Sequence, residues 1–232
     1  MKVKQFRYSA DNLGYVVYSS SEAVAIDGGA VNDILDFCRE SGLKIKYITN
    51  THMHHDHTSG NRELMDQSKA TFLDCTQINS DRHIALNSEQ LQVFPTPGHT
   101  SDSVSFKGDG FLITGDTLFN GTVGNCFSGD LDAFYYSLKR LISEPEDTII
   151  YGGHDYVLES LQVARSIEKD NHHITRYNEK YNPSLILSTL SDELTVNPYI
   201  RFNAQRIIDK LRNVNMPSDT ALARFKSIME IF

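Results

Sequence analysis

Short apolar runs bounded by glycine, proline or charged residues dominate the first two-thirds of the chain. Runs of this length between turn residues are typical of β-strands that are buried in a sheet. We predict a hairpin whose strands cover 15–18 and 23–26. We expect further strands over the segments 45–49, 71–73, 91–94, 103–107, 111–114 and 148–151.

Apolar residues at helical spacing predict helices between some of these strands. Residues 32–40 carry apolar side chains at helical spacing and are followed by Gly42, a common helix stop. Asp130 predicts the cap of a helix that reaches Leu141.

The pattern changes from Val157 onward, because apolar residues then recur mainly at helical spacing and little of the chain has strand character. We therefore predict a mixed α/β domain over residues 1–155, followed by a smaller helical domain over residues 156–232. No internal repeat or low-complexity segment suggests a different organisation.

The composition limits the class of protein. Hydrophobic residues make up 40% of the chain and charged residues 22%, which is typical of a globular protein. The net charge of −8, with no basic run longer than Lys139-Arg140, argues against a nucleic-acid partner. No apolar run approaches the roughly 20 residues that a membrane-spanning helix needs.

The N-terminal residues contain no apolar signal core, and the three cysteines (Cys38, Cys75 and Cys126) form no C-x-x-C pair. We therefore expect reduced thiols and a cytoplasmic protein with neither a membrane nor a nucleic-acid partner. The expected oligomeric state is a monomer.

Ligand-type residues gather in THMHHDHTSGN (51–61), directly after a predicted strand, and recur after later strands beside glycines. Loops at strand ends commonly present functional side chains, and glycines allow a backbone to approach an ion closely. A single loop histidine usually only makes hydrogen bonds, but the whole pattern indicates a metal centre. The candidate ligands are His52, His54, Asp56, His57, His99, Asp116 and His154.

The number of candidates predicts two ions. Seven ligands without a cysteine are too many for one closed tetrahedral zinc site, but they suit three ligands per ion and one bridging carboxylate. His52 and His54 face the same side of an extended segment, whereas Asp56 and His57 follow where the chain bends toward a helix near Gly60. Zinc is the first choice for these ligands, with iron and manganese as alternatives. The remaining histidines are expected to be structural or solvated: His55, His83, His172 and His173.

These motifs resemble those of the metallo-β-lactamase superfamily, and within it those of glyoxalase II, the hydroxyacylglutathione hydrolases. The likeness spans nearly the whole chain and implies an αββα sandwich followed by a helical domain that contributes to substrate binding. The segments that carry it are DNLGYVVY (11–18), THMHHDHTSGN (51–61), TPGHTSDS (96–103), ITGDTLF (113–119), GGHDY (152–156) and STLSDELTVNPYIR (188–201).

The resemblance also implies a division of the ligands between the ions. One ion would be held by His52, His54 and His99, the other by Asp56, His57 and His154, with Asp116 bridging them. The implied enzyme hydrolyses S-D-lactoylglutathione, or a related hydroxyacyl thioester, to a 2-hydroxy acid and a free thiol in methylglyoxal detoxification. A hydroxide between the two metals would be the nucleophile, positioned by Asp56 and Asp116.

The residues expected to bind the thiol part of the substrate depart from the family pattern. The family usually has a basic residue and a tyrosine in the loop GNCFSG (124–129), where this chain has Asn125 and Phe127. In the last helix Lys226 occupies an arginine position of the family, whereas Tyr156 matches a family tyrosine. Glutathione recognition could be weak or rearranged, another thiol could replace glutathione, or other basic residues could supply the charge: Arg176, Lys180 or Arg201.

Four other functions are compatible with parts of the pattern. A persulfide dioxygenase with a single iron shares several ligand motifs but not the tail NPYIR (197–201). A ribonuclease Z-type nuclease would need a basic surface, which the net charge of −8 disfavours. A lactonase would use the same nucleophile on an ester, and a catalytically idle binding protein would not be expected to retain all the ligands.

Overall fold

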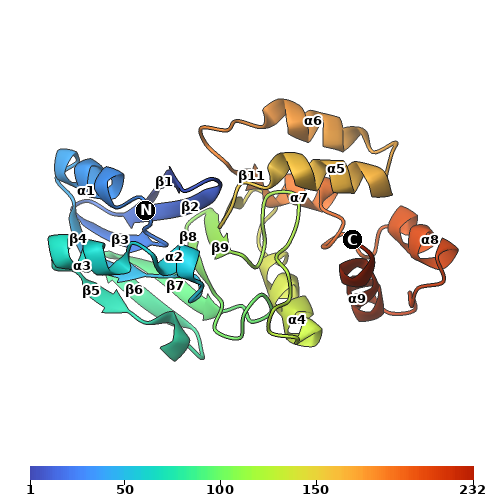
Figure 1. Cartoon of the computed structure of the whole chain (residues 1–232), viewed down its shortest axis with the longest axis horizontal. Coiled ribbons are helices and arrows are strands. Elements are labelled where there is room, and N and C mark those ends of the chain that lie inside the picture. Colours follow the sequence, from blue (N-terminus) through green and yellow to red (C-terminus); the bar gives the residue numbers. More distant parts are fainter.

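The computed structural model describes all 232 residues and consists of two β-sheets, flanking helices and a C-terminal helical region (Figure 1). The first sheet has the strand order β1-β2-β3-β4-β5, and the second has the order β11-β10-β9-β8-β7-β6. The strands are β1 (Lys2–Tyr8), β2 (Asn12–Tyr18), β3 (Glu22–Ile26), β4 (Lys44–Thr49), β5 (Thr71–Leu73), β6 (Arg82–Leu86), β7 (Glu89–Pro95), β8 (Val104–Gly108), β9 (Phe111–Gly115), β10 (Ile149–Gly152) and β11 (Ser188–Thr189).

The alternation of side chains along β2 explains how the layers assemble. Successive residues of a strand point to opposite faces of its sheet. Tyr15 and Val17 belong to the core between the two sheets, together with Phe106 from β8, whereas Val16 packs on the outer face under the helices. A strand buried on both sides must be apolar at nearly every position, as β2 is.

Helices cover the outer face of each sheet and complete the predicted αββα sandwich. Ile34 and Leu64 pack on the first sheet, and Phe134 packs on the second. Three helices and two short helical turns belong to this part of the chain: α1 (Val31–Glu40), α2 (His55–Thr58), α3 (Asn61–Ser68), η1 (Cys75–Gln77) and α4 (Leu131–Leu141).

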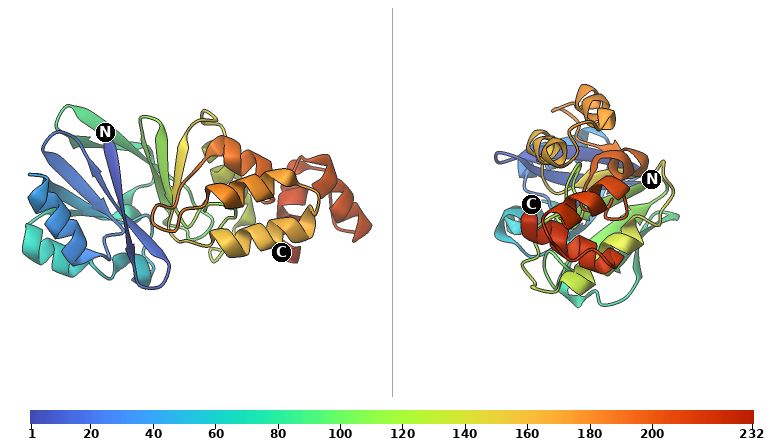
Figure 2. Two further views of the ribbon diagram at one scale, coloured as in Figure 1. Left: turned by 90° about the horizontal axis from the view of Figure 1, so that it is seen from above. Right: turned by 90° about the vertical axis from the view of Figure 1, so that its right-hand side faces the viewer.

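The C-terminal helices lie at one end of the sandwich and lengthen the molecule in that direction (Figure 2). Val157 and Ile174 share a core with residues between the two sheets, and Leu190 and Phe225 share another with the outer face of the second sheet. Since the cores are continuous, the division of the chain at residue 155 stays a prediction. The helices are α5 (Val157–Ile167), α6 (His172–Lys180), α7 (Leu190–Val196), α8 (Gln205–Asn213) and α9 (Ala221–Ile231).

A buried carboxylate joins the helical region to the sandwich. Glu193 in α7 accepts hydrogen bonds from the hydroxyls of Tyr177 and Ser188, the side-chain amide of Asn197 and the backbone N–H of Gly121. Gly121 lies in the loop after β9, so this carboxylate fixes that loop against the helices. Burial raises the pKa of Glu193, against the opposing effect of these donors.

The predicted interior strands agree with the structure, but the strands β1, β6 and β11 were not predicted. All three are edge strands: β1 in the first sheet, and β6 and β11 in the second. Edge strands carry charged residues on their exposed side, as in KVKQFRY of β1, and β11 has only two residues. All three cysteines are free thiols. None of the helices has the length and apolar character needed to cross a membrane.

Candidate metal centre

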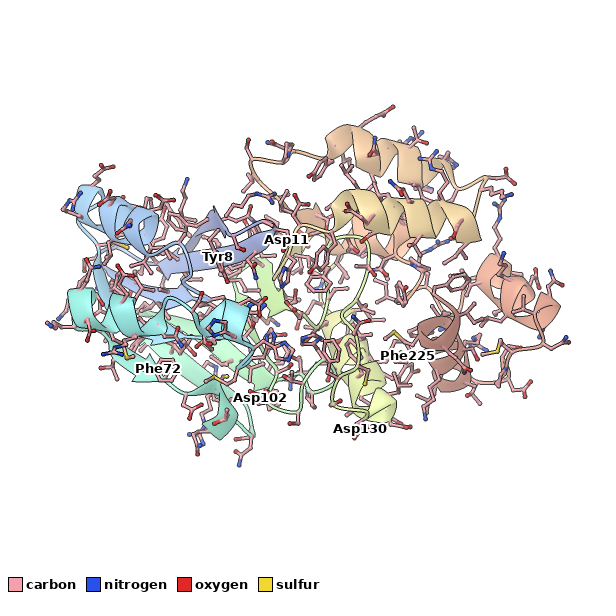
Figure 3. All side chains as sticks on the ribbon, in the orientation of Figure 1. Tyr8, Asp11, Phe72, Asp102, Asp130 and Phe225 are labelled. Carbon is pink, nitrogen blue, oxygen red and sulfur yellow. The ribbon has the colours of Figure 1, made fainter.

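The seven predicted ligand residues lie together at the end of the sandwich that faces the helical region. They come from loops that directly follow β4, β7, β9 and β10, so the sheets hold each loop at its base. Asp11 and Asp102, both labelled in Figure 3, lie in two further loops at this end. The segment after β4 supplies ligand candidates to both of the groups described below.

The first group contains only histidines. Nε2 of His52 is 2.9 Å from Nδ1 of His54, and this atom is 3.1 Å from Nε2 of His99. The rings of His52 and His99 are buried, and His54 is partly exposed. Three nitrogen atoms therefore converge on one point at the surface of the sandwich.

The second group combines a carboxylate with two histidines. Nε2 of His57 is 3.2 Å from Nε2 of His154, and Oδ2 of Asp56 is 3.5 Å and 3.3 Å from these two atoms. Asp56 and His57 belong to the short helix α2, which turns both side chains toward His154. His55, in the same turn, belongs to neither group.

Asp116 lies between the two groups. Its Oδ1 is 3.3 Å from Nε2 of His57, and its Oδ2 is 3.5 Å from Nε2 of both His99 and His154. Oδ2 is also 3.9 Å from Nε2 of His52. The carboxylate therefore contacts histidines of both groups, as a bridging ligand would.

The donor atoms fit metal ions in spacing and chemistry. Atoms bound tetrahedrally to zinc at about 2.0–2.1 Å are about 3.3 Å apart. The distances between the donor atoms here scatter around that value, and the atoms of each group lie within 4.8 Å of one another. Oδ1 of Asp116 is buried and has no hydrogen-bond partner, which is costly unless the atom meets a cation.

Electrostatics also favour cations at this position. Burial lowers the pKa of His52 to about 4 and lowers the pKa of His99, so both rings are neutral at physiological pH and can donate a lone pair. Burial also disfavours a charged His57, but the carboxylates of Asp27 and Asp116 outweigh burial and hold its pKa well above the usual value. The carboxylates thus stabilise positive charge in the centre.

Two glycines allow the loops to approach this closely. A Cβ atom on Gly153 would lie 2.2 Å from Oδ1 of Asp116, and one on Gly124 would lie 2.0 Å from the backbone oxygen of Asp116. A side chain at Gly153 would displace the carboxylate of Asp116, and one at Gly124 would displace its backbone. The glycine that precedes His154 in the sequence therefore has a steric reason.

A second layer of residues, which the sequence did not single out, holds the outer nitrogens of the rings. Nδ1 of His57 is 3.0 Å from Oδ2 of Asp27, and Nδ1 of His154 is 2.8 Å from Oδ1 of Asp11. Asp27 has a positive φ of 52°. In the sequence, the only signal for it is its position before two glycines. Asp11 begins the segment DNLGYVVY (11–18), which carries part of the family resemblance, but the resemblance implies no role for it.

The predicted substrate-binding residues are more widely separated than the metal-ligand candidates. The ring of Tyr156 stacks on that of His154, with centroids 4.9 Å apart. Phe127 is 67% exposed, and its ring lies 5.2 Å from that of His99. Asn125 offers its backbone oxygen to Nδ1 of His99 at 2.8 Å.

Three of the four basic residues considered for substrate binding are paired with acids, and Arg176 is the exception. Nζ of Lys226 is 2.5 Å from Oδ2 of Asp132 at the start of α4. Lys180 is bonded to Asp192, and Arg201 is bonded to Glu168 within the helical region. Arg201 therefore connects helices to one another and does not connect them to the sandwich.

Comparison with known protein families accounts for almost the whole chain. The family described as Metallo-beta-lactamase superfamily matches residues 12–72 and 77–154. The family described as Hydroxyacylglutathione hydrolase C-terminus matches residues 155–230. The two matches follow one another along the sequence.

Individual proteins with high similarity agree with these matches. A hydroxyacylglutathione hydrolase of Tolumonas auensis is 34% identical over 184 residues, covering 74% of this chain and 72% of that protein. One of Chromohalobacter salexigens is 30% identical and covers 88% of both chains. Among solved structures, ETHE1 from Myxococcus xanthus has a TM-score of 0.70 at 23% identity, covering 98% of this chain and 100% of that one. The BLEG-1 B3 metallo-beta-lactamase has a TM-score of 0.64 at 21% identity, covering 86% and 99%. At such low identity the two structures show a shared fold.

Proposed function

Because the chain belongs to the metallo-beta-lactamase superfamily, and within it to the hydroxyacylglutathione hydrolase family, we propose that it hydrolyses hydroxyacyl thioesters. S-D-lactoylglutathione is the reference substrate, and the products are a 2-hydroxy acid and a free thiol. The observation that carries this proposal is the convergence of two groups of ligand-type side chains around the carboxylate of Asp116. The activity would serve methylglyoxal detoxification, in a monomeric cytoplasmic enzyme that acts on a small molecule.

We assign one divalent ion to His52, His54 and His99, and a second to Asp56, His57 and His154, with Asp116 shared. Zinc suits these nitrogen and oxygen donors best, and iron or manganese are the alternatives. When bound, such a pair of ions polarises a carbonyl group and brings the pKa of water toward 7, so that water can attack without a protein nucleophile.

The carboxylates of the chain orient the attacking water. Nδ2 of Asn12 donates to Oδ2 of Asp56 at 2.9 Å and holds this side chain toward His57 and His154. The side chain is still 46% exposed, so it can also accept a hydrogen bond from an incoming water. Asp116, which is buried, keeps the two histidine groups at a fixed separation.

Aromatic rings flank the centre and would bind the substrate on either side of the thioester. Tyr156 lies beside His154, and Phe127 lies beside His54 and His99. We assign both residues, together with Asn125, to the substrate-binding surface. Lys226 would bind a carboxylate of glutathione only by exchanging its ion pair with Asp132, so a thioester of a different thiol is the alternative substrate.

The test is the release of thiol from S-D-lactoylglutathione by the purified protein, followed with a thiol reagent. We expect turnover by the metal-loaded protein, loss of turnover after chelation and in Asp56→Asn, and full turnover in Asp109→Asn, a control in an exposed turn. A panel that includes thioesters of other small thiols identifies the preferred thiol.

Two results would reject the proposal. One is a metal-loaded protein that is inactive on every thioester of the panel. The other is oxygen consumption with a glutathione persulfide at one iron per chain, which would identify a persulfide dioxygenase.

A further inference from the structure

The two groups of histidines differ in what holds their outer nitrogens. In the Asp56, His57 and His154 group, both rings bond to carboxylates, those of Asp27 and Asp11. In the other group, the ring of His52 bonds to the hydroxyl of Thr51, and the ring of His99 bonds to a backbone oxygen. The charge behind the rings is therefore concentrated on one side of the centre.

The two supporting carboxylates are themselves held differently. Asp27 is completely buried and also accepts hydrogen bonds from the backbone N–H and the hydroxyl of Thr51. Asp11 lies in the turn between β1 and β2, its side chain is 38% exposed, and its carboxylate bonds only to His154. The fold needs Asp27 for its own packing, whereas the carboxylate of Asp11 serves only the ring of His154.

Asp155, at the junction with the helical region, fixes the turn that carries Asp11. The backbone oxygen of Asp11 accepts a hydrogen bond from the N–H of Asp155 at 2.9 Å. The carboxylate of Asp155 bonds to Arg7 in β1 and accepts a hydrogen bond from the hydroxyl of Tyr181 at 2.8 Å. Asp11 lies on the side of the sandwich that faces α5 (Figure 3).

We propose that Asp11 is a positioning residue that orients His154 and thereby sets the affinity of the Asp56, His57 and His154 group for its metal ion. A carboxylate can only accept a hydrogen bond, so the proton of a neutral His154 ring is on Nδ1 and the lone pair of Nε2 faces the centre. A carboxylate behind a ligating histidine also makes the ring a stronger donor. This inference rests on the metal assignment within the proposed function.

The experiment compares Asp11→Ala, Asp11→Asn and the control Asp109→Asn. Each protein is loaded with zinc and exposed to increasing concentrations of a chelator, and the bound metal per chain is counted. We expect Asp11→Ala to lose one of two ions at a chelator concentration about 10- to 100-fold lower than the wild type, with the other ion retained. Asp11→Asn keeps an oxygen acceptor and should lose that ion at an intermediate concentration.

Cobalt substitution gives a second readout. In the Asp11 variants, the visible spectrum of only one of the two cobalt ions should differ from that in the wild type. The midpoint temperature of thermal unfolding of the metal-free proteins should be the same for all variants. This result separates positioning of His154 from a general structural role. Equal weakening of both ions, or unchanged retention of both, would overturn the inference. So would a wild type that binds fewer than two ions.

Metal counting requires no substrate, so the two proposals can fail separately. A wild type that binds two ions, responds to Asp11→Ala as expected and hydrolyses no thioester would refute the proposed function. The role of Asp11 would stand in that case. If the protein hydrolyses thioesters but its metal retention does not depend on Asp11, the proposed function stands and the role of Asp11 is refuted.

Discussion

The metal centre and the expected thiol-binding surface differ in how firmly the fold determines them. In the metal centre, side chains from several strand ends contact one another, and most of them are buried. On the thiol-binding surface, formed by residues 124–129 and α9, Phe127 is exposed and Lys226 bonds to Asp132 at the protein surface. The chemistry of the reaction is therefore specified more strictly than the identity of the thiol.

This difference leads to different expectations for substitutions in the two regions. A change in the metal centre should lower kcat and the bound metal for every substrate. A change on the thiol-binding surface should alter KM and should depend on which thiol the substrate carries.

Asp116→Asn should have the largest effect, because it removes the charge shared by the two histidine groups. Loss of several kcal/mol of electrostatic stabilisation corresponds to a decrease in kcat of about two to three orders of magnitude. Steady-state kinetics and metal counting on the same samples test this. Unchanged kcat with both ions bound would show that Asp116 has no part in the reaction.

Glu193→Ala should destabilise the joint between the helical region and the loop that leads to Phe127. Four buried donors would lose their acceptor, and we expect the free energy of unfolding to fall by about 3 kcal/mol or more. Urea unfolding measures this, with Glu230→Ala on the exposed end of α9 as the control. Equal stability of the two variants would mean that this carboxylate does not join the regions.

Phe127→Ala should raise KM for the preferred thioester by up to about tenfold, since an aromatic contact contributes on the order of 1 kcal/mol. The kcat and the metal content should not change. Tyr136→Ala provides a matched control, because Tyr136 is 65% exposed but lies on α4, outside residues 124–129. A fall in kcat without a change in KM would move Phe127 from substrate binding to catalysis.

Asp132→Asn should have the smallest effect, because exposed ion pairs contribute little. It releases Lys226 from its partner, so KM for S-D-lactoylglutathione should fall by about threefold or less, while KM for a thioester without a carboxylate should not change. When Lys226→Met is added to Asp132→Asn, the KM values for the two substrates should no longer respond differently. Identical responses of both substrates would exclude Lys226 from the binding surface.

The extent to which the sequence predicted these regions has a physical explanation. The strands β2, β3 and β9 are buried over nearly their whole length and were predicted, whereas the edge strands β1 and β6 mix charged and apolar residues and were not. The ligand candidates stand out because histidines and aspartates rarely recur beside glycines after so many strands. Asp11 and Asp27 do not stand out, because aspartate is common in turns and only the folded structure places each beside a particular ring nitrogen.

The positions of the substrate-binding residues could be predicted only by resemblance. Their side chains are exposed, and few internal contacts restrict them. The pairing of Lys226 with Asp132 depends on the contact between α4 and α9, which no local pattern encodes. Their roles stay predictions, as do the roles of the metal ligands and the domain boundary.

Titration of the metal-free protein with zinc, while thiol release from S-D-lactoylglutathione is followed, shows whether the protein is a two-metal hydrolase. The rate should rise with added metal until two ions are bound per chain, and it should not rise further. Asp116→Asn should remain nearly inactive throughout the titration. Full activity of the metal-free protein, or a maximal rate at one ion per chain, would contradict the proposed two-metal hydrolase.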